Sequence, residues 1–236
     1  MTDTAPDTAH HTTPAPHAKP GSRAERPGNH ADRRPSLAVG VMGSASGTIP
    51  PEVSARARSL GRAVARAGCT LITGACPGLP QEAVVGASDE GGLVLGISPA
   101  LSEQEHVERY GSPTEGFDAL IYTGSGLMGR EVVNIRSSDI VVIVGGHSGT
   151  LGEFAIAYDE GRLIGVLTGT DGVADLIDEV VGRLSKETGA KILYDDDPDR
   201  LIASLIDYYR TVHFHRPHSL FSGADHEGGV VPPAPA

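Results

Sequence analysis

The sequence predicts an α/β fold, a single Rossmann-like domain built on a doubly wound parallel sheet. Short apolar runs alternate with segments of helical periodicity, which is the pattern of a parallel sheet covered on both faces. Several runs are continuous Val, Ile and Leu segments rather than alternating ones, as expected for strands buried on both sides. Glycine-rich loops follow three of the runs, and in this architecture such loops line a ligand cleft at the carboxyl ends of the strands.

The first half of the domain alternates strand and helix twice. The run Leu37–Met42 ends at a glycine-rich loop, and Pro51–Ala67 then fits a helix with proline in its first turn and Gly68 at its stop. The next run, Cys69–Thr73, passes through a second glycine-rich loop into a predicted helix at Leu79–Glu90.

The second half continues this alternation. The clearest strand is the run at 140–144, which contains only Val and Ile. Aspartates 195–197 precede the last helix and suit its N-terminal dipole, although the same acidic run could attract a divalent cation. The expected strands are Leu93–Ile97, Ala119–Tyr122, Ile140–Val144 and Leu163–Leu167, and the expected helices are Gly129–Ser137, Thr150–Glu160, Val173–Thr188 and Pro198–Thr211.

Both ends of the chain differ in composition from the middle. Residues 1–35 are dominated by Thr, Pro, Ala, His and Asp, so they cannot bury enough apolar surface to offset the entropy of ordering. We therefore expect a disordered tail at 1–35, the folded domain at 36–212 and a second loose tail at 213–236. A chain of 236 residues is long enough for one domain with a sizeable core.

Charge and composition exclude several classes of function. A formal net charge of -11 argues against a nucleic-acid-binding surface, which is usually basic. No apolar run reaches the roughly 18 residues needed to span a bilayer. The two cysteines, Cys69 and Cys76, are too few for a disulfide framework, and the N-terminus lacks a secretory signal. We expect a cytoplasmic protein with neither nucleic acid nor a membrane as its partner.

The strongest functional signal follows the strand at 140–144. There a glycine-rich loop leads into a predicted helix that carries Glu153 about one turn from its start. Backbone N–H groups at a helix N-terminus, together with the helix dipole, attract a phosphate. Glu153 would lie near that anion without serving as its ligand, which indicates chemistry rather than storage. The candidate phosphate-binding residues are Gly145, Gly146, Gly149 and Thr150.

Two more glycine-rich loops and an arginine are expected at the same rim. The first loop, around Gly43, lacks the Gly-x-Gly-x-x-Gly spacing of dinucleotide sites, which disfavours NAD. Each loop taken alone is equally compatible with an ordinary tight turn. Arg130 offers a guanidinium fork for phosphate oxygens or a ribose hydroxyl. The alternative is a surface arginine that pairs with Glu131 or Asp139.

These motifs together resemble the LONELY GUY (LOG) family over roughly residues 37–180. The resemblance is carried by Gly145-Gly146-x-x-Gly149-Thr150-x-x-Glu153, by Arg130 and by Gly91-Gly92-x-x-x-Gly96-Ile97-x-Pro99. It implies a homodimeric Rossmann-like enzyme that hydrolyses the N-glycosidic bond of an AMP-like nucleoside 5′-monophosphate and releases ribose 5-phosphate. It implies catalytic roles for Arg130 and Glu153, a phosphate seat in the loop, and further nucleotide contacts at Ser44 and Gly74.

The chain also departs from the family's pattern. Val144 replaces the proline of Pro-Gly-Gly-x-Gly-Thr, the loop is one residue longer, and Gly129-Arg130-Glu131 stands where activating enzymes have Glu-Arg-Lys. These departures resemble a divergent bacterial branch that includes proteins similar to molybdenum-cofactor carriers. The alternative function is therefore a non-catalytic carrier that holds a nucleotide or the molybdenum cofactor on the same phosphate loop.

We expect no resident metal or cofactor. Pyridoxal-phosphate chemistry, suggested by an old label of the family, needs a lysine for its Schiff base. The three lysines, Lys19, Lys186 and Lys191, all lie outside the glycine-rich loops.

Overall fold

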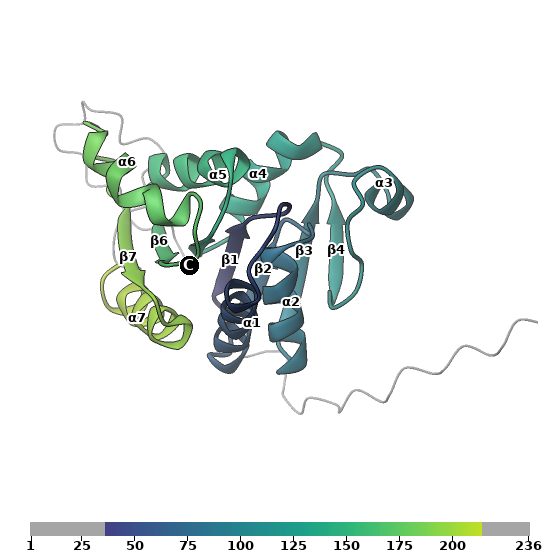
Figure 1. The fold of residues 1–236 in the computed structure, drawn as a ribbon, viewed down its shortest axis with the longest axis horizontal. Coiled ribbons are helices and arrows are strands. Elements are labelled where there is room, and N and C mark those ends of the chain that lie inside the picture. Colours follow the sequence, from purple (N-terminus) through teal and green to yellow (C-terminus); the bar gives the residue numbers. More distant parts are fainter. Residues whose placement is uncertain (1–35, 214–236) are drawn as a thin grey trace, which may run out of the picture. The chain divides into compact units, whose positions relative to one another are not determined.

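The computed structural model describes residues 36–213, and nearly all of both predicted tails therefore lies outside the described residues. The described chain forms a wholly parallel seven-stranded sheet in the order β4-β3-β2-β1-β5-β6-β7 (Figure 1). The strands are β1 (Ala38–Gly43), β2 (Thr70–Thr73), β3 (Leu93–Ser98), β4 (Ala119–Tyr122), β5 (Ile140–Val144), β6 (Leu163–Leu167) and β7 (Lys191–Asp195).

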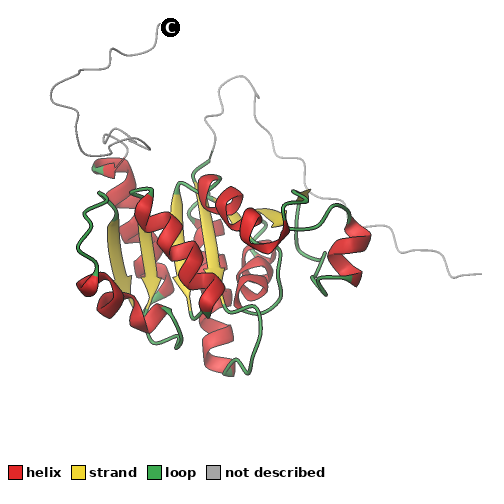
Figure 2. Ribbon diagram, turned by 90° about the horizontal axis from the view of Figure 1, so that it is seen from above, coloured by secondary structure: helices red, strands yellow, loops and turns green. Residues whose placement is uncertain are grey.

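Helices cover both faces of the sheet, as Figure 2 shows from above. One core contains side chains of α1, α2 and α7, and the other contains side chains of α4, α5, η2 and α6. Successive residues of β5 alternate between them: Val142 and Val144 face the first core, and Val141 and Ile143 face the second. The helices are α1 (Pro51–Arg66), α2 (Leu79–Asp89), α3 (Glu103–Glu108), α4 (Gly126–Arg136), α5 (Ser148–Asp159), η2 (Ala174–Leu176), α6 (Ile177–Arg183) and α7 (Pro198–Thr211).

The order of the strands fixes where a ligand cleft can form. The chain builds the sheet outward from β1 to β4 and then returns to place β5 on the other side of β1. The connections after β1 and β5 therefore leave in opposite directions, which makes a topological switch point. In open α/β sheets ligands bind at such a point, outside the carboxyl ends of the strands.

The predicted α/β fold and its six strands are confirmed, but a seventh strand was missed. β7 contains three apolar residues between Lys191 and Asp195, and none of its residues is fully buried. It lies at the edge of the sheet, so one side has no neighbouring strand and the long apolar run of a central strand is not required.

One expected helix was wrong in extent, and one helix was missed. The helix expected at Val173–Thr188 is a short η2 turn followed by α6, and it ends at Arg183. The polar helix α3 was not predicted, although Ser102 is followed three residues later by Glu105, which is a capping-box signature. In the structure Ser102 Oγ accepts a hydrogen bond from Glu105 N at 3.2 Å. His213, assigned to the loose tail, is buried against the ring of Tyr209.

Close packing of α1 on α2 depends on two glycines and gives a first prediction. A Cβ atom at Gly61 would overlap the carbonyl group of Ala83, and one at Gly86 would overlap that of Arg58. Gly61→Ala should therefore lower the free energy of unfolding by about 1–3 kcal/mol, because the neighbour is rigid backbone. Urea unfolding would measure this. Gly182→Ala on α6 is the matched control, because a Cβ there meets nothing within 4 Å, and an equal loss in both variants would contradict the prediction.

Candidate functional site

A cavity of about 240 Å³ lies at the switch point. It is bounded by the loop after β1, by the loop after β2 and by the facing parts of α4 and α5. Five of the predicted site residues line it: Gly74, Arg130, Gly149, Thr150 and Glu153. The remaining lining residues are Val41, Met42, Gly43, Ala45, Ser46, Cys76, Pro80, Leu127, Glu131 and His147.

The other three predicted residues, Ser44, Gly145 and Gly146, take part in hydrogen bonds that hold the glycine-rich loop after β5. Gly145 N donates a hydrogen bond to Thr170 Oγ1 at 2.9 Å, and Gly146 N donates to Ser44 Oγ at 2.7 Å. These two amides are therefore not free for a phosphate, which corrects the predicted phosphate seat. Ser44 does not line the cavity at the switch point and instead lines a smaller neighbouring cavity of about 150 Å³. The Ser44 hydroxyl thus helps to hold the loop that leads into α5.

The start of α5 does present free backbone donors. Its N-cap residue, His147, makes no side-chain capping bond, and the first intrahelical donor is Leu151 N, which bonds to His147 O at 3.0 Å. Within residues 36–213 no acceptor bonds to the amides of Ser148, Gly149 or Thr150. These N–H groups and the helix dipole make the rim of the cavity a suitable place for an anion.

Arg130 and Glu153 form a buried pair inside the cavity. Arg130 Nη1 lies 3.4 Å from Glu153 Oε1, and each residue is 6% exposed. The guanidinium lies directly over Gly74, because a Cβ at that glycine would overlap Nη1. The alternative of a surface arginine paired with Glu131 or Asp139 is therefore wrong. Because Gly74 has no side chain, it leaves the space that the Arg130 guanidinium occupies.

The pKa of the Glu153 carboxyl is raised toward neutral pH, from 4.5 to about 7. Burial is the largest cause and the nearby charge of Glu131 adds to it, while Arg130 and a hydrogen bond from Asn134 oppose the shift. Both protonation states are therefore populated near neutral pH, which suits a group that exchanges protons. Cys76 in the same cavity behaves differently, because burial raises its pKa to about 11 and keeps it a neutral thiol.

The pKa shift of Glu153 predicts a pH-dependent stability. Between 4.5 and about 7 the folded protein holds this proton more tightly than the unfolded chain does. The free energy of unfolding should therefore fall as pH rises through this window, by on the order of 3 kcal/mol in total. Urea unfolding of the wild type and of Glu153→Gln at several pH values would isolate the effect, since the variant lacks this fall. Parallel profiles would mean that the carboxyl has an ordinary pKa.

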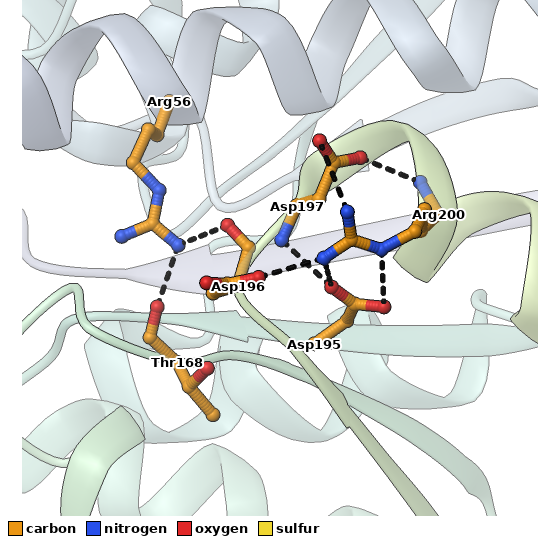
Figure 3. A network of polar contacts seen from close by, with 6 residues as sticks. All are labelled: Arg56, Thr168, Asp195, Asp196, Asp197 and Arg200. Carbon is orange, nitrogen blue, oxygen red and sulfur yellow. Dashed lines mark hydrogen bonds and ion pairs between the residues drawn. The ribbon is translucent and has the colours of Figure 1, made fainter.

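The acidic run at 195–197 caps a helix. Asp197 Oδ1 accepts a hydrogen bond from Arg200 N at 2.8 Å, and the Arg200 guanidinium reaches the carboxylates of all three aspartates (Figure 3). Within residues 36–213 no group of three or more His, Cys, Asp and Glu side chains is arranged to hold a metal ion. Of the two alternatives for this run, the helix cap is the one observed.

Arg56 on α1 braces the same end of the sheet. Its guanidinium donates to Thr168 O at 2.6 Å and to Gly169 O at 2.7 Å, and Figure 3 shows it beside Thr168 and Asp196. The next residue, Thr170, holds Gly145 N. The start of α5 is therefore positioned through a chain of contacts that begins on the opposite face of the sheet.

Two residues of this arrangement, Asn134 and Thr170, were not predicted from the sequence. Asn134 is fully buried on α4, one turn after Arg130, and its amide lies between Met42 Sδ and Glu153. Thr170 holds the glycine loop from the connection after β6. The spacing Arg130-x-x-x-Asn134 places both residues on one helical face, which could have indicated Asn134.

The fold and the cavity define a Rossmann-like protein with a ligand site at the switch point of its sheet. Residues 36–202 match the SLOG cluster4 family, and the chain belongs to that family. An uncharacterised protein from Archaeoglobus fulgidus is 32% identical over 131 residues, which cover 56% of this chain and 80% of the relative. The matched family is not the LOG family itself, so the narrower LOG assignment stays a prediction.

Three solved structures resemble this one. The TM1055 protein has a TM-score of 0.63 at 27% identity, covering 72% of this chain and 98% of that one. The molybdenum cofactor binding protein of Rippkaea orientalis has a TM-score of 0.62 at 29% identity, with coverage of 75% and 98%. The molybdenum cofactor carrier protein of Chlamydomonas reinhardtii has a TM-score of 0.58 at 27% identity, with coverage of 73% and 97%.

Within residues 36–213 no helix is both long enough and apolar enough to cross a bilayer.

Proposed function

We propose that this protein binds a nucleoside 5′-monophosphate in the cavity and hydrolyses its N-glycosidic bond. The observation that carries the proposal is the position of Glu153. This carboxyl is buried, titrates near neutrality, and lines the same cavity as the free amides at the start of α5. A phosphate on those amides leaves the sugar beside the carboxyl, where an acid–base group is needed.

The reaction consumes one water molecule. The bond between C1′ and the base nitrogen breaks, its electron pair leaves with the base, and the base takes up a proton. Water adds to C1′ and gives a proton to the ionised Glu153, and this proton passes on to the departing base, which returns the carboxylate to its ionised state. The positive charge that develops on the ribose is stabilised by the same carboxylate. Arg130 keeps part of the Glu153 population ionised and balances charge in a site shielded from water. The products are the free base and ribose 5-phosphate.

An assay on the purified chain tests this activity. AMP, GMP, CMP and their 2′-deoxy forms are each incubated with the protein, and release of the sugar phosphate is measured by a reducing-sugar assay. We expect turnover of at least one ribonucleotide without added metal. Nucleotide binding with no turnover of any of them would contradict the enzymatic part of the proposal.

A second candidate function is a carrier that does not turn over its ligand. It is favoured by two of the similar structures, which are named as a molybdenum cofactor binding protein and a molybdenum cofactor carrier protein. In that role the amides of Ser148 to Thr150 would hold the phosphate of the pterin. Retention of the isolated cofactor through gel filtration, together with no hydrolysis of nucleotides, would support the carrier.

We further propose that the protein is a cytoplasmic homodimer. Leu127, Met128 and Val133 on α4 and Leu151 on α5 are exposed apolar residues, and Met128 is 81% exposed. The two helices are in contact, and exposed apolar side chains on neighbouring helices are typical of an interface. Cys69 and Cys76 are free thiols, as expected in a reducing compartment.

A charge on α4 should disrupt this dimer. In Met128→Glu, a carboxylate would have to be buried at the interface, so we expect a monomer where the wild type is a dimer. Light scattering after gel filtration measures the mass. Val212→Glu on a different exposed position is the control, and a wild-type monomer would contradict the proposal.

A further inference from the structure

The residue after Arg130 places a second carboxylate in the cavity. Glu131 lines the cavity, and its side chain lies along the first turns of α5. A Cβ built at Gly149 would lie 3.6 Å from Glu131 Oε1, and one built at Gly152 would lie 3.3 Å from Oε2. The absence of side chains at these two glycines leaves the room that the carboxylate occupies.

This carboxylate is half-buried and has no protein partner. Within residues 36–213 it makes no hydrogen bond and no ion pair, whereas Glu153 contacts Arg130. Burial raises the pKa of Glu131, and the charge of Arg130 opposes that shift. An ionised carboxylate only accepts hydrogen bonds, so a half-buried one in a cavity calls for a ligand that brings donors.

The position of Glu131 relative to α5 indicates which donors these are. A phosphate seated on the amides of Ser148 to Thr150 caps the helix, so the attached sugar is the next group along the ligand. Glu131 lies beside that same turn, and Glu153 lies close enough for the two charges to interact. Ribose offers two adjacent hydroxyl donors, and carboxylates are the groups that bind ribose hydroxyls in Rossmann-like sites.

We propose that Glu131 accepts hydrogen bonds from the 2′- and 3′-hydroxyl groups of the ribose and makes the site selective for ribonucleotides over 2′-deoxyribonucleotides. This inference rests on the proposed function, because it takes the ligand to be a nucleoside 5′-monophosphate. It adds the class of sugar that the site accepts. Glu131 is thus a specificity-determining residue, distinct from the pair that acts at C1′.

The test compares two ligands in two proteins. Affinities for AMP and for 2′-deoxy-AMP are measured by calorimetry in the Glu153→Gln background, where hydrolysis is blocked, with and without Glu131→Ala. We expect AMP to bind about tenfold or more tightly than 2′-deoxy-AMP when Glu131 is present, since hydrogen bonds to charged groups are strong. In Glu131→Ala we expect the ratio to approach one. Affinity for 2′-deoxy-AMP should hold or rise, because a negative charge near the phosphate is removed.

Controls separate this inference from the proposed function. Glu131→Gln keeps the shape of the side chain and should give an intermediate ratio, and Glu103→Ala on the exposed side of α3 should leave the ratio unchanged. Two outcomes would overturn this inference alone. In the first, both nucleotides bind but their affinities are nearly equal while Glu131 is present. In the second, AMP still binds more tightly than 2′-deoxy-AMP after Glu131→Ala. If neither of these nucleotides binds, and GMP, CMP and their 2′-deoxy forms do not bind either, the proposed function is overturned and the inference with it.

Discussion

Glu153→Gln should reduce hydrolysis about a thousandfold while nucleotide affinity stays within a few fold. Glutamine preserves the size of the buried side chain but can neither accept a proton from water nor carry the charge that stabilises the ribose. The proposed phosphate seat at the start of α5 consists of backbone amides, which the substitution leaves in place. The single-turnover rate and the dissociation constant, each measured separately in both proteins, distinguish the two effects.

The pH profile gives an independent check on the same residue. Because the pKa of Glu153 is about 7 and the ionised form is the base, wild-type activity should rise with pH through neutrality and then level off. Glu179→Gln on the exposed side of α6 is the control and should have the wild-type profile. Full activity in Glu153→Gln would remove this residue from the mechanism.

The sequence predicted the sheet well because burial on both faces leaves a local signal. Central strands such as β5 consist only of apolar residues, and the proline at position 51 marks the start of α1 in the sequence. The signal fades at the edges of the sheet. β7 needs fewer apolar residues because one of its sides has no neighbouring strand, and the polar α3 is marked only by its cap. Such elements are specified by tertiary contacts that a local pattern does not contain.

Five of the predicted site residues line one cavity, but the contacts between them were not predicted. Arg130 and Glu153 are separated by 23 residues, and no local pattern states that their side chains meet in a buried pair. The glycine loop did suggest an anion site. Whether its amides are free depends, however, on Ser44 and Thr170, which are 102 and 25 residues away from their bonding partners. Long-range hydrogen bonds of this kind decide which donors remain for a ligand.

Gly74→Ala tests whether activity depends on the long-range contact between Arg130 and Glu153. It should reduce activity about a hundredfold with little loss of stability. The added methyl group would occupy the place of the Arg130 guanidinium, which is the mobile end of a long side chain and can move aside. The fold therefore tolerates the change, but the contact with Glu153 is lost. Because Arg130 lowers the pKa of Glu153, the pH at which activity rises should also move upward.

Gly182→Ala is the control for Gly74→Ala. Both substitutions add one methyl group, but at Gly182 it meets nothing within 4 Å, so activity and its pH profile should stay unchanged. Kinetics across pH, together with thermal unfolding of both variants, distinguish a displaced arginine from a damaged fold. Normal activity in a stably folded Gly74→Ala would mean that the Arg130–Glu153 contact is not needed for the reaction. A lowered activity with an unshifted profile would mean that Arg130 acts on the ligand directly rather than through the carboxylate.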